Sequence, residues 1–527
     1  MWTAILLIAA ISALLVWSMH KLRYFSSRGV RTFPPFPLLG NLTAVTFGRE
    51  NFVDTVAAGY EAFSDQRYFG LYQYHVPTLV PRDPELLRQI MVRDFNSFTD
   101  RGIHYGADCD PLFGKNIFML QGSKWRETRN ALTPTFSGAR MRCMAPLMDE
   151  CARAATAHLK TTVKSITEID TNELITACVN DVIASCAFGS GVNTHAEPQN
   201  LIYRLGQTAA IQHTTQIMKF FGYENFPSFM KLSGMKIIPS DAAEQFNALF
   251  KSALEARRQR QVVRPDFIQT LVDAGRGKLK QGTTDNNENK EEANNHNWTK
   301  KFTDDDLVAQ AVLFYVAGLD TTSNLISFFL YEMAMNPEVQ KKLQEELDSV
   351  PDSDSTKDLY ERIQSMEYLD MTISEVLRLW PLAGTYDRRS TATYDFGPTA
   401  EGSKHHLVAE AGIHIWIPAF CLHRDPRYWE LPERCVPERF SPSRRADIVP
   451  YTYLPFGTGP RACIGSRFAV LTAKIVLARL LREFEVSRSA RTPAPQRLAP
   501  RAFVLRPAQG FFLNIRPRHA VTEGQKP

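Results

Sequence analysis

Apolar residues recur three and four positions apart along most of this chain, which is the spacing that predicts amphipathic helices. This helical pattern covers 123–140, 143–166, 172–188, 304–335, 337–349, 358–379 and 466–484. Strand-like runs are fewer and shorter, and lie at or near Leu71–Val80, His414–Ile417 and Phe511–Ile515. The pattern therefore predicts one mainly α domain with a small antiparallel β subdomain.

The first residues form a different pattern, because Trp2 to Met19 are almost continuously apolar. A run of about 20 apolar residues is long enough to cross a bilayer as a helix. No basic residue precedes this run, whereas four follow it: Lys21, Arg23, Arg28 and Arg31. That charge order favours a retained anchor over a cleaved signal peptide and places the rest of the chain in the cytosol. We predict one N-terminal transmembrane helix over residues 1–20.

Two further segments differ from the helical body. Residues 21–40 are basic and proline-rich, which favours a stiff extended connector. Residues 283–297 are almost wholly polar, and we predict a mobile surface loop there, inside a single domain that covers 41–527. The glycosylation pattern that begins at Asn297 is expected to stay unmodified if the body faces the cytosol.

Composition excludes several classes of function. A net charge of +5, spread over 527 residues, does not indicate a nucleic-acid-binding protein. The eight cysteines contain no C-x-x-C pair, which argues against a zinc or thioredoxin-type site. A chain of this size in a reducing compartment also does not need a disulfide framework. Most of these cysteines are therefore expected to be small buried hydrophobic residues.

Cys463 requires another explanation. Residues 456–465 read Phe-Gly-Thr-Gly-Pro-Arg-Ala-Cys-Ile-Gly, and an amphipathic helical pattern follows. Glycines allow a tight loop that approaches a flat ligand closely, and a thiol just before a helix N-terminus is favoured as a thiolate. Arg461 can pair with a carboxylate such as a haem propionate. The pattern indicates a thiolate ligand of haem iron, the alternative being a buried structural cysteine.

With this motif the sequence resembles the cytochrome P-450 superfamily, over nearly the whole chain after the anchor. The resemblance implies a haem-thiolate monooxygenase fold, with haem b held by the thiolate of Cys463 and molecular oxygen as cosubstrate. It implies insertion of one oxygen atom into apolar small molecules such as xenobiotics, lipids or hormones. Phrases such as Arg82-Asp-Pro-Glu85 are similar to animal microsomal members, especially the insect detoxification and vertebrate drug-metabolising families.

The segment Ala317-Gly-Leu-Asp-Thr-Thr322 lies midway through the 304–335 pattern and matches the family's A-G-x-[DE]-T-T. A glycine inside a helix costs about 1 kcal/mol relative to alanine, and close passage over a haem face would explain it. The resemblance makes Asp320 and Thr321 the catalytic pair that delivers protons to bound dioxygen. The alternative is a threonine that hydrogen-bonds to its own helix backbone and bends a core helix.

Glu375 and Arg378 match the family's E-x-x-R, although Glu85 and Arg88 fit the same pattern. Spacing alone predicts only an exposed helical ion pair. The resemblance implies instead that Arg439 joins Glu375 and Arg378 in a buried charge network that supports the cysteine loop. Cys435 and Val436 depart from the residues that many relatives carry nearby, which puts local packing in doubt but not the cofactor.

The resemblance also supplies candidate partners for the haem propionates. These are Trp125 and Arg129 in a W-x-x-x-R pattern, together with Arg101 and Arg388. The alternative for each arginine is a solvated surface charge.

Electrons have to come from another protein, because no G-x-G-x-x-G fingerprint follows a strand. The resemblance implies NADPH-cytochrome P-450 reductase, with cytochrome b5 as a further candidate donor, at the cytosolic face of the endoplasmic reticulum membrane. Basic residues near the cysteine can steer an acidic flavoprotein or simply keep the surface soluble: Lys124, Arg126, Arg142 and Arg467.

Two other functions are compatible with a haem-thiolate motif. An enzyme of the same fold can isomerise or dehydrate an oxygenated lipid without a reductase, although such relatives often lack the pair formed by Asp320 and Thr321. A haem-binding sensor or carrier is the non-enzymatic alternative, and it needs neither a proton relay nor an apolar pocket.

Overall fold

The computed structural model describes residues 2–103, 106, 110–210, 214–259, 266–275, 302–350, 359–500, 502 and 504–518. The predicted polar loop 283–297 and the glycosylation pattern at Asn297 lie outside the described residues.

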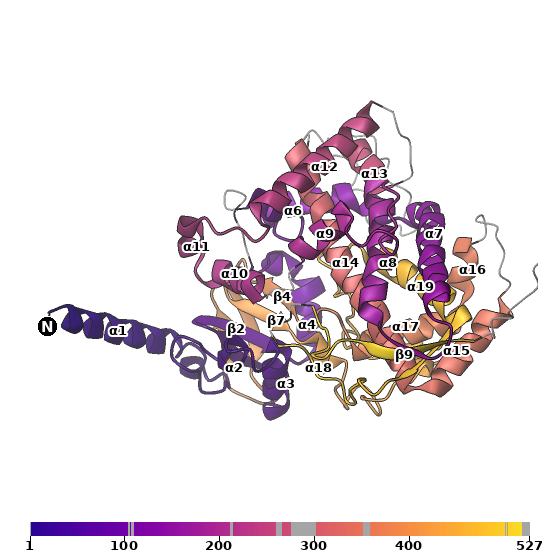
Figure 1. Cartoon of the computed structure of the whole chain (residues 1–527). Coiled ribbons are helices and arrows are strands. Elements are labelled where there is room, and N and C mark those ends of the chain that lie inside the picture. Colours follow the sequence, from indigo (N-terminus) through magenta and orange to yellow (C-terminus); the bar gives the residue numbers. More distant parts are fainter. Residues whose placement is uncertain are drawn as a thin grey trace, which may run out of the picture.

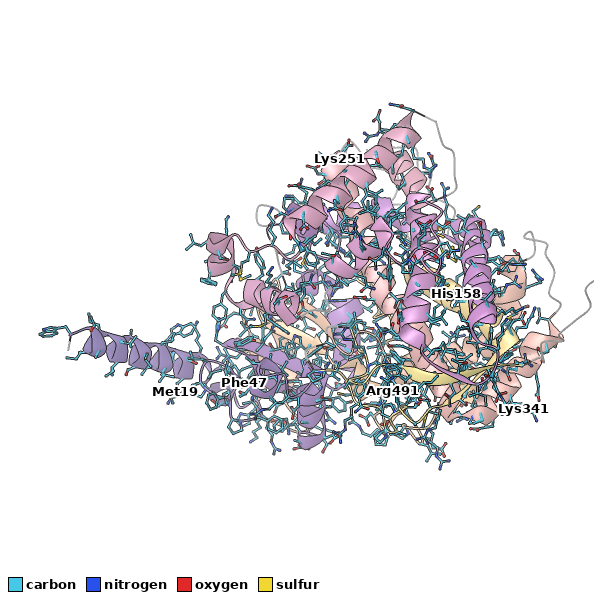
Figure 2. The ribbon with its side chains drawn as sticks, viewed as in Figure 1. Met19, Phe47, His158, Lys251, Lys341 and Arg491 are labelled. Carbon is cyan, nitrogen blue, oxygen red and sulfur yellow. The ribbon has the colours of Figure 1, made fainter. Side chains whose placement is uncertain are left out.

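Helix α1 (Trp2–Lys21) projects from the body, as Figure 1 shows at the left. Its side chains are exposed over nearly the whole length, and Figure 2 shows Met19 close to the body end of this helix. The helix is long and apolar enough to cross a membrane. Ser18 is the buried exception, because its hydroxyl accepts the N–H of Leu38 at 2.8 Å. The N-terminal apolar helix therefore suits a membrane anchor.

The connector packs against the body along its length, from Phe25 to the bridges that Thr32 and Gly40 form with Gly70 and Gln73. Phe25 is fully buried against Gly70, where an added Cβ would lie 2.3 Å from the Phe25 ring. The N–H of Phe25 donates to the hydroxyl of Tyr72 at 2.9 Å. This contact fixes where the chain that follows α1 joins the body.

Helices make up most of the body, which confirms the predicted fold class. The helices before the longest one are α2 (Thr43–Thr46), α3 (Phe52–Ala62), α4 (Pro84–Arg88), α5 (Pro111–Gly114), α6 (Gly122–Leu132), α7 (Gly138–Thr162), α8 (Thr171–Ile183), α9 (Leu201–Ala209), α10 (Thr214–Asn225), α11 (Pro227–Ser233), α12 (Ser240–Arg258) and α13 (Phe267–Gly275). The longest and the later ones are α14 (Asp304–Met335), α15 (Pro337–Ser349), α16 (Leu359–Ser365), α17 (Glu367–Leu379), α18 (Ala419–Leu422) and α19 (Ser466–Glu483).

Helix α14 runs through the middle of the molecule (Figure 1) and packs against α8, α12, α17 and α19. It is also long and apolar enough to cross a membrane, but 67% of its most apolar window is buried, so it is a core helix. Thr303 starts it with a capping box, in which Thr303 and Asp306 exchange hydrogen bonds. The predicted bounds of α14 and α15 are confirmed.

Other predicted helices are divided. The pattern over 123–140 is not one helix, because α6 ends at Leu132 and α7 starts at Gly138. Pro134 lacks the N–H that a continuous helix requires at this point. The 358–379 pattern is likewise split into α16 and α17, and residue 358 lies outside the described residues.

The strands form small sheets. The four-stranded sheet has the order β1-β2-β7-β4, from β1 (Tyr68–Gln73), β2 (Val76–Pro81), β7 (His414–Ile417) and β4 (Tyr386–Arg389). The other sheets combine β3 (Thr167–Asp170), β9 (Phe512–Pro517) and β8 (Phe484–Arg488), and β5 (Tyr394–Pro398) with β6 (His406–Ala409).

Two strand predictions need correction. The run Leu71–Val80 spans a hairpin, because the chain turns at Tyr74, which has a positive φ of 55°. Among the described strands β1 to β9, the pairs are antiparallel except that β2 and β7 run parallel, with Thr78 opposite His414. These strands lie far apart in the sequence, so alternation of polar and apolar residues did not reveal their direction.

Candidate active site

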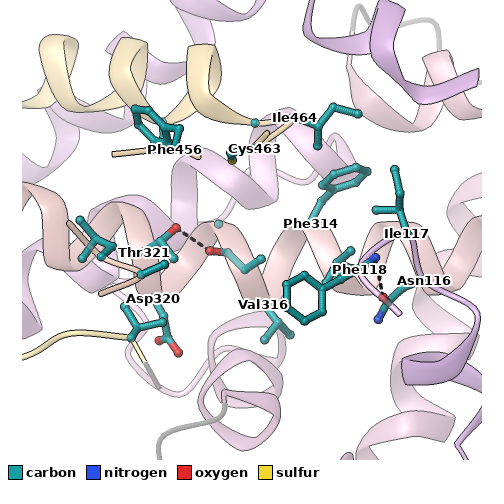
Figure 3. Close-up of a pocket in the computed structure, with 18 of the residues that line it drawn as sticks. Asn116, Ile117, Phe118, Phe314, Val316, Asp320, Thr321, Phe456, Cys463 and Ile464 are labelled. Atoms are coloured by element: carbon teal, nitrogen blue, oxygen red, sulfur yellow. Dashed lines mark hydrogen bonds between the residues drawn. The ribbon is translucent and has the colours of Figure 1, made fainter. Parts of the chain in front are cut away.

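A cavity of about 430 Å³ lies between α14 and the loop that carries Cys463. Its walls are mainly apolar, and Figure 3 shows Phe314 and Phe118 among the side chains that line it. The aromatic residues of the lining are Phe52, Phe113, Phe118, Trp125, Phe136, Phe220, Phe221, Phe267, Phe314, Tyr386, Trp416, Phe456 and Phe468. Such a cavity suits an apolar small molecule.

Backbone geometry forms the loop before Cys463. Gly457 and Gly459 both have φ of +70°, which side chains rarely adopt. A Cβ on Gly459 would lie 2.0 Å from the carbonyl oxygen of Met91, so no side chain fits there. The N–H of Cys463 donates to the carbonyl of Phe456 at 2.9 Å. The loop therefore presents the cysteine at one fixed position.

The Cys463 side chain lies just before α19, as the sequence predicts, and faces the cavity. Cys463 is exposed, and it lines the cavity. Burial raises the pKa of this thiol, whereas the N–H groups of Gly465 and Ser466 and the charge of Arg129 oppose that rise. A metal cation at the sulfur would favour the thiolate.

Four arginines place positive charge at this cavity: Arg388 and Arg461 are buried, and Arg101 and Arg129 are half-buried. Arg101, Arg129 and Arg461 line it, and Arg388 lies close enough to Arg101 to be repelled by it. Burial, with repulsion from Arg101, lowers the pKa of Arg461 to about 8 and that of Arg388 to about 9. The Nε atoms of Arg101 and Arg388 lack hydrogen-bond partners among the described residues.

These residues fit a haem. The thiol is available to an iron ion, the apolar walls to a flat macrocycle, and the cluster of cations to the two propionate carboxylates. The cations outnumber the carboxylates that act on them, namely Asp387 and Asp100. A dianionic ligand would therefore relieve the repulsion within the cluster.

Two of the predicted propionate partners already support the cysteine loop. Arg129 donates to the carbonyl of Ala462 at 2.8 Å. Arg461 donates to the carbonyls of Thr99 and Leu120 at 2.9 and 2.8 Å, and its guanidinium lies 4.0 Å from the centre of the Trp125 ring. These contacts bring the predicted residues together without showing what else they bind.

Helix α14 forms the opposite side of the cavity. Ala317 is exposed in the middle of this largely buried helix, because it faces the cavity. The Thr321 hydroxyl donates to the carbonyl of Ala317 at 2.6 Å, which is the backbone bond that the sequence left open as an alternative. Figure 3 shows this bond, with the Asp320 carboxylate on the side of α14 away from Cys463.

The glycine in this helix has a structural reason other than the expected one. A Cβ on Gly318 would lie 3.1 Å from Cδ1 of Ile183 on α8. The missing side chain therefore allows α14 and α8 to pack closely, and room above a haem is not needed to explain it.

Arg378 is fully buried, and all its donors have acceptors. It pairs with Glu375 through Nε and Nη2 at 2.8 and 2.9 Å. Its other N–H groups reach the carbonyls of His423 and Pro432, both at 2.7 Å, and of Arg434 at 3.1 Å. This accounts for the five donors of a guanidinium.

Arg439 joins the network, as the resemblance implied. Its Nε lies 3.4 Å from Oε1 of Glu375, and its Nη2 donates to the carbonyl of Leu431 at 3.0 Å. The N–H of Val436 also donates to Oε1 of Glu375, at 2.8 Å. The unusual residue at 436 keeps this bond because only its backbone takes part.

Sequence reasoning missed His423, which links this network to the cysteine loop. Leu454, two residues before Phe456, donates its N–H to Nε2 of His423 at 2.7 Å. Nδ1 lies 3.1 Å from the carbonyl of Arg378, so Nδ1 carries the proton. Burial, with the charge of Arg378, lowers the pKa of His423 to about 3 and keeps it neutral. A lone histidine in a loop gives no signal of this role.

Sequence reasoning also missed a group that we call the polar corner: Gln73, Glu224, Asp387 and His414. The first three line the cavity, and His414 lies behind Glu224. They come from β1, α10, β4 and β7, so no local spacing connects them.

The basic residues proposed for reductase binding are exposed. Lys124 and Arg126 lie on α6, and Arg467 lies in the first turn of α19. Arg142 is paired with Glu361 at 2.7 Å, which leaves it less available to a partner.

Comparisons with known proteins agree with this geometry. Residues 30–514 match the family model described as Cytochrome P450. The chain is 35% identical to "Cytochrome P450 9e2" of Blattella germanica, over 98% of both chains. It is 32% identical to "Probable cytochrome P450 9f2" of Drosophila melanogaster, over 98% of this chain and 100% of the other. It is 33% identical to "Probable cytochrome P450 6a13" of the same species, over 93% and 94%.

Proposed function

This chain belongs to the cytochrome P450 family, and on that premise we propose that it oxidises apolar small molecules with electrons from a separate reductase. It is a monooxygenase, an oxidoreductase whose cofactor is haem with a thiolate-bound iron. The observation that carries the proposal is the position of Cys463, which faces an apolar cavity from the N-terminal end of α19.

Each side chain around the cofactor has a proposed role. Haem iron with a thiolate ligand supplies dioxygen binding and O–O cleavage. Cys463 is the proposed ligand, and the N–H groups of Gly465 and Ser466 would favour its thiolate form together with the iron. The residues proposed to orient the propionates are Arg461, Trp125, Arg129, Arg388 and Arg101. Glu375, Arg378 and Arg439 hold the loop in place.

Thr321 is proposed to pass protons into the cavity. Its hydroxyl donates to Ala317 at present, and a rotation about its Cα–Cβ bond would aim the same proton into the cavity. Asp320 also lines the cavity and is buried, so it can replace the proton that Thr321 gives up.

The proposed location rests on α1, and the proposed partners rest on exposed basic residues near Cys463. The apolar α1 supports a membrane anchor, and the basic residues after it favour a cytosolic body at the endoplasmic reticulum. NADPH-cytochrome P-450 reductase is the proposed electron donor, with cytochrome b5 as a further candidate. The exposed Lys124, Arg126 and Arg467 can attract an acidic partner to the cysteine side.

The proposed substrates are apolar xenobiotics, lipids or hormones. Aromatic side chains from many elements line the cavity, and they favour flat or branched hydrocarbon groups over charged ones.

The first test is the absorption spectrum of the reduced holoprotein with carbon monoxide. We expect a strongly red-shifted Soret band in the wild type and loss of that shift in Cys463→Ala. Cys421→Ala is the matched control, because Cys421 is buried away from the cavity and should leave the shift intact. An unshifted band in the folded wild type would contradict thiolate ligation by Cys463.

A further inference from the structure

The polar corner lies where α10 meets the four-stranded sheet. Nε2 of Gln73 donates to Oε2 of Glu224 at 2.6 Å, and Nδ1 of His414 lies 3.7 Å from Oε1 of Glu224. The Glu224 side chain is only 3% exposed, and Gln73, Asp387 and His414 are buried as well. The carboxyl group of Glu224 is thus buried at a cavity whose walls are mainly apolar.

Among the described residues, three buried polar atoms of the polar corner have no hydrogen-bond partner: Nδ1 of His414 and two acceptor oxygens. Oε1 of Gln73 and Oδ1 of Asp387 are buried without a hydrogen-bond partner among the described residues. The other oxygen of Asp387, Oδ2, accepts the N–H groups of Gly102 and Ile103 at 2.6 and 3.3 Å. Unpaired buried acceptors are costly in a folded protein, so these atoms indicate a ligand that brings donors.

Charge in the polar corner is also unbalanced. Arg101 and Arg388 act on Asp387, whereas the basic side chain that lies beside Glu224 is His414. Burial lowers the pKa of His414, so this ring is mostly neutral at neutral pH. Burial and the Asp387 charge together raise the pKa of Glu224 to about 8. A cation beside Glu224 would favour the charged form of its carboxyl group and so lower its pKa.

The unpaired acceptors and the carboxyl group of Glu224 favour a ligand that brings both hydrogen-bond donors and a positive charge. A primary ammonium group offers three N–H donors and one positive charge, a hydroxyl offers one donor, and a carbonyl offers none. Phe220 and Phe221, on the same helix as Glu224, line the cavity beside it and can cover an apolar remainder.

We propose that Glu224, Asp387 and Gln73 bind the ammonium group of an apolar amine substrate and thereby turn its hydrocarbon part toward Cys463. This inference names a substrate class for the proposed monooxygenase and rests on that function. The amine nitrogen would stay away from the iron, because the polar corner holds it.

Equilibrium dialysis of the holoenzyme with two matched probes tests the proposal. The probes are phenylbutylamine and pentylbenzene, in which a methyl group replaces the ammonium. We expect Glu224→Gln to weaken binding of the amine about tenfold and to leave the hydrocarbon unchanged, because it removes one charged hydrogen bond. Equal losses for both probes, or no loss for the amine, would overturn the proposal.

Two further variants separate the ion pair from a general disturbance. Glu224→Asp keeps the charge and should retain part of the amine affinity. Glu244→Gln makes the same charge change at an exposed position on α12 and should change neither affinity.

The Soret band of the same samples locates the amine nitrogen. A red shift on adding phenylbutylamine would place the nitrogen on the iron and overturn the proposal, whereas an unshifted or blue-shifted band supports it. Dialysis does not depend on the carbon monoxide spectrum. If that spectrum contradicted thiolate ligation while Glu224→Gln still affected the amine alone, the proposed function would fail and the amine site would stand.

Discussion

The network behind the cysteine loop and the polar corner are both buried and charged, yet they are built in opposite ways. Every donor of Arg378 has an acceptor, and both ring nitrogens of His423 are paired. In the polar corner, acceptor atoms of Gln73 and Asp387 have no donor within the part of the chain that the structure describes. One buried polar group is complete by itself, and the other is not.

This difference indicates that the network around Arg378 holds a fixed geometry, whereas the polar corner is suited to bind a ligand. A fully paired buried network holds one geometry, which suits a loop that must keep Cys463 at a fixed place. A buried acceptor without a donor costs about 1–3 kcal/mol. The chain tolerates that cost on the wall that would receive the substrate.

The largest expected effect is on the paired network. Arg378→Lys should lower the free energy of unfolding by about 3–5 kcal/mol, because lysine leaves buried acceptors without donors. Denaturant unfolding of the holoprotein and its haem content would measure this loss. Arg88→Lys is the matched control, since Arg88 pairs with Glu85 at the same spacing but is 41% exposed, and it should cost less than about 1 kcal/mol. Equal losses of unfolding free energy in Arg378→Lys and Arg88→Lys would contradict the role given to the buried pairing of Arg378.

The cysteine loop itself should be nearly as sensitive. Gly459→Ala should cost about 2–4 kcal/mol, because it adds backbone strain and a clash with Met91. Gly402→Ala has nearly the same φ, +71°, but open space around it, so it isolates the strain alone. Thermal unfolding of both variants gives the difference, and a larger loss in Gly402→Ala would contradict the close approach.

Thr321, on the helix opposite Cys463, should affect coupling and leave folding intact. We expect Thr321→Ala to lower product formed per NADPH consumed by about tenfold, because a proton donor is lost. Ser327→Ala removes a buried hydroxyl from the same helix outside the cavity lining and should leave this ratio unchanged. The ratio requires parallel NADPH and product measurements. An unchanged ratio in Thr321→Ala would remove Thr321 from the proton path.

The last prediction concerns the response of the polar corner to pH. The pKa of Glu224 is raised from its usual 4.5 to about 8, so the folded state holds a proton that the unfolded state releases. Relative to Glu224→Gln, the wild type should therefore lose stability as pH rises from about 4.5 to about 8, by at most about 1.4 kcal/mol per pH unit. Unfolding free energies of both proteins over this range measure the slope. A difference independent of pH would mean that Glu224 is not protonated in the folded state.

Local signals in the sequence predicted much of the fold and of the site. The bounds of α14 and α15 were right because cap residues and apolar spacing are local. The position of Cys463 before a helix was right for the same reason. The pattern over 123–140 was too long because apolar spacing continues across Pro134, where the helix cannot.

Sequence by itself determined the apolar N-terminal helix, the helical class and the cysteine loop, since each depends on residues that are neighbours along the chain. Only the tertiary structure decided that β2 lies parallel to β7, that His423 joins Arg378 to Leu454, and that the polar corner exists. The polar corner assembles residues from 73 to 414, and its properties come from burial. Burial and pairing between distant segments arise from packing, which leaves no periodic signal in the chain.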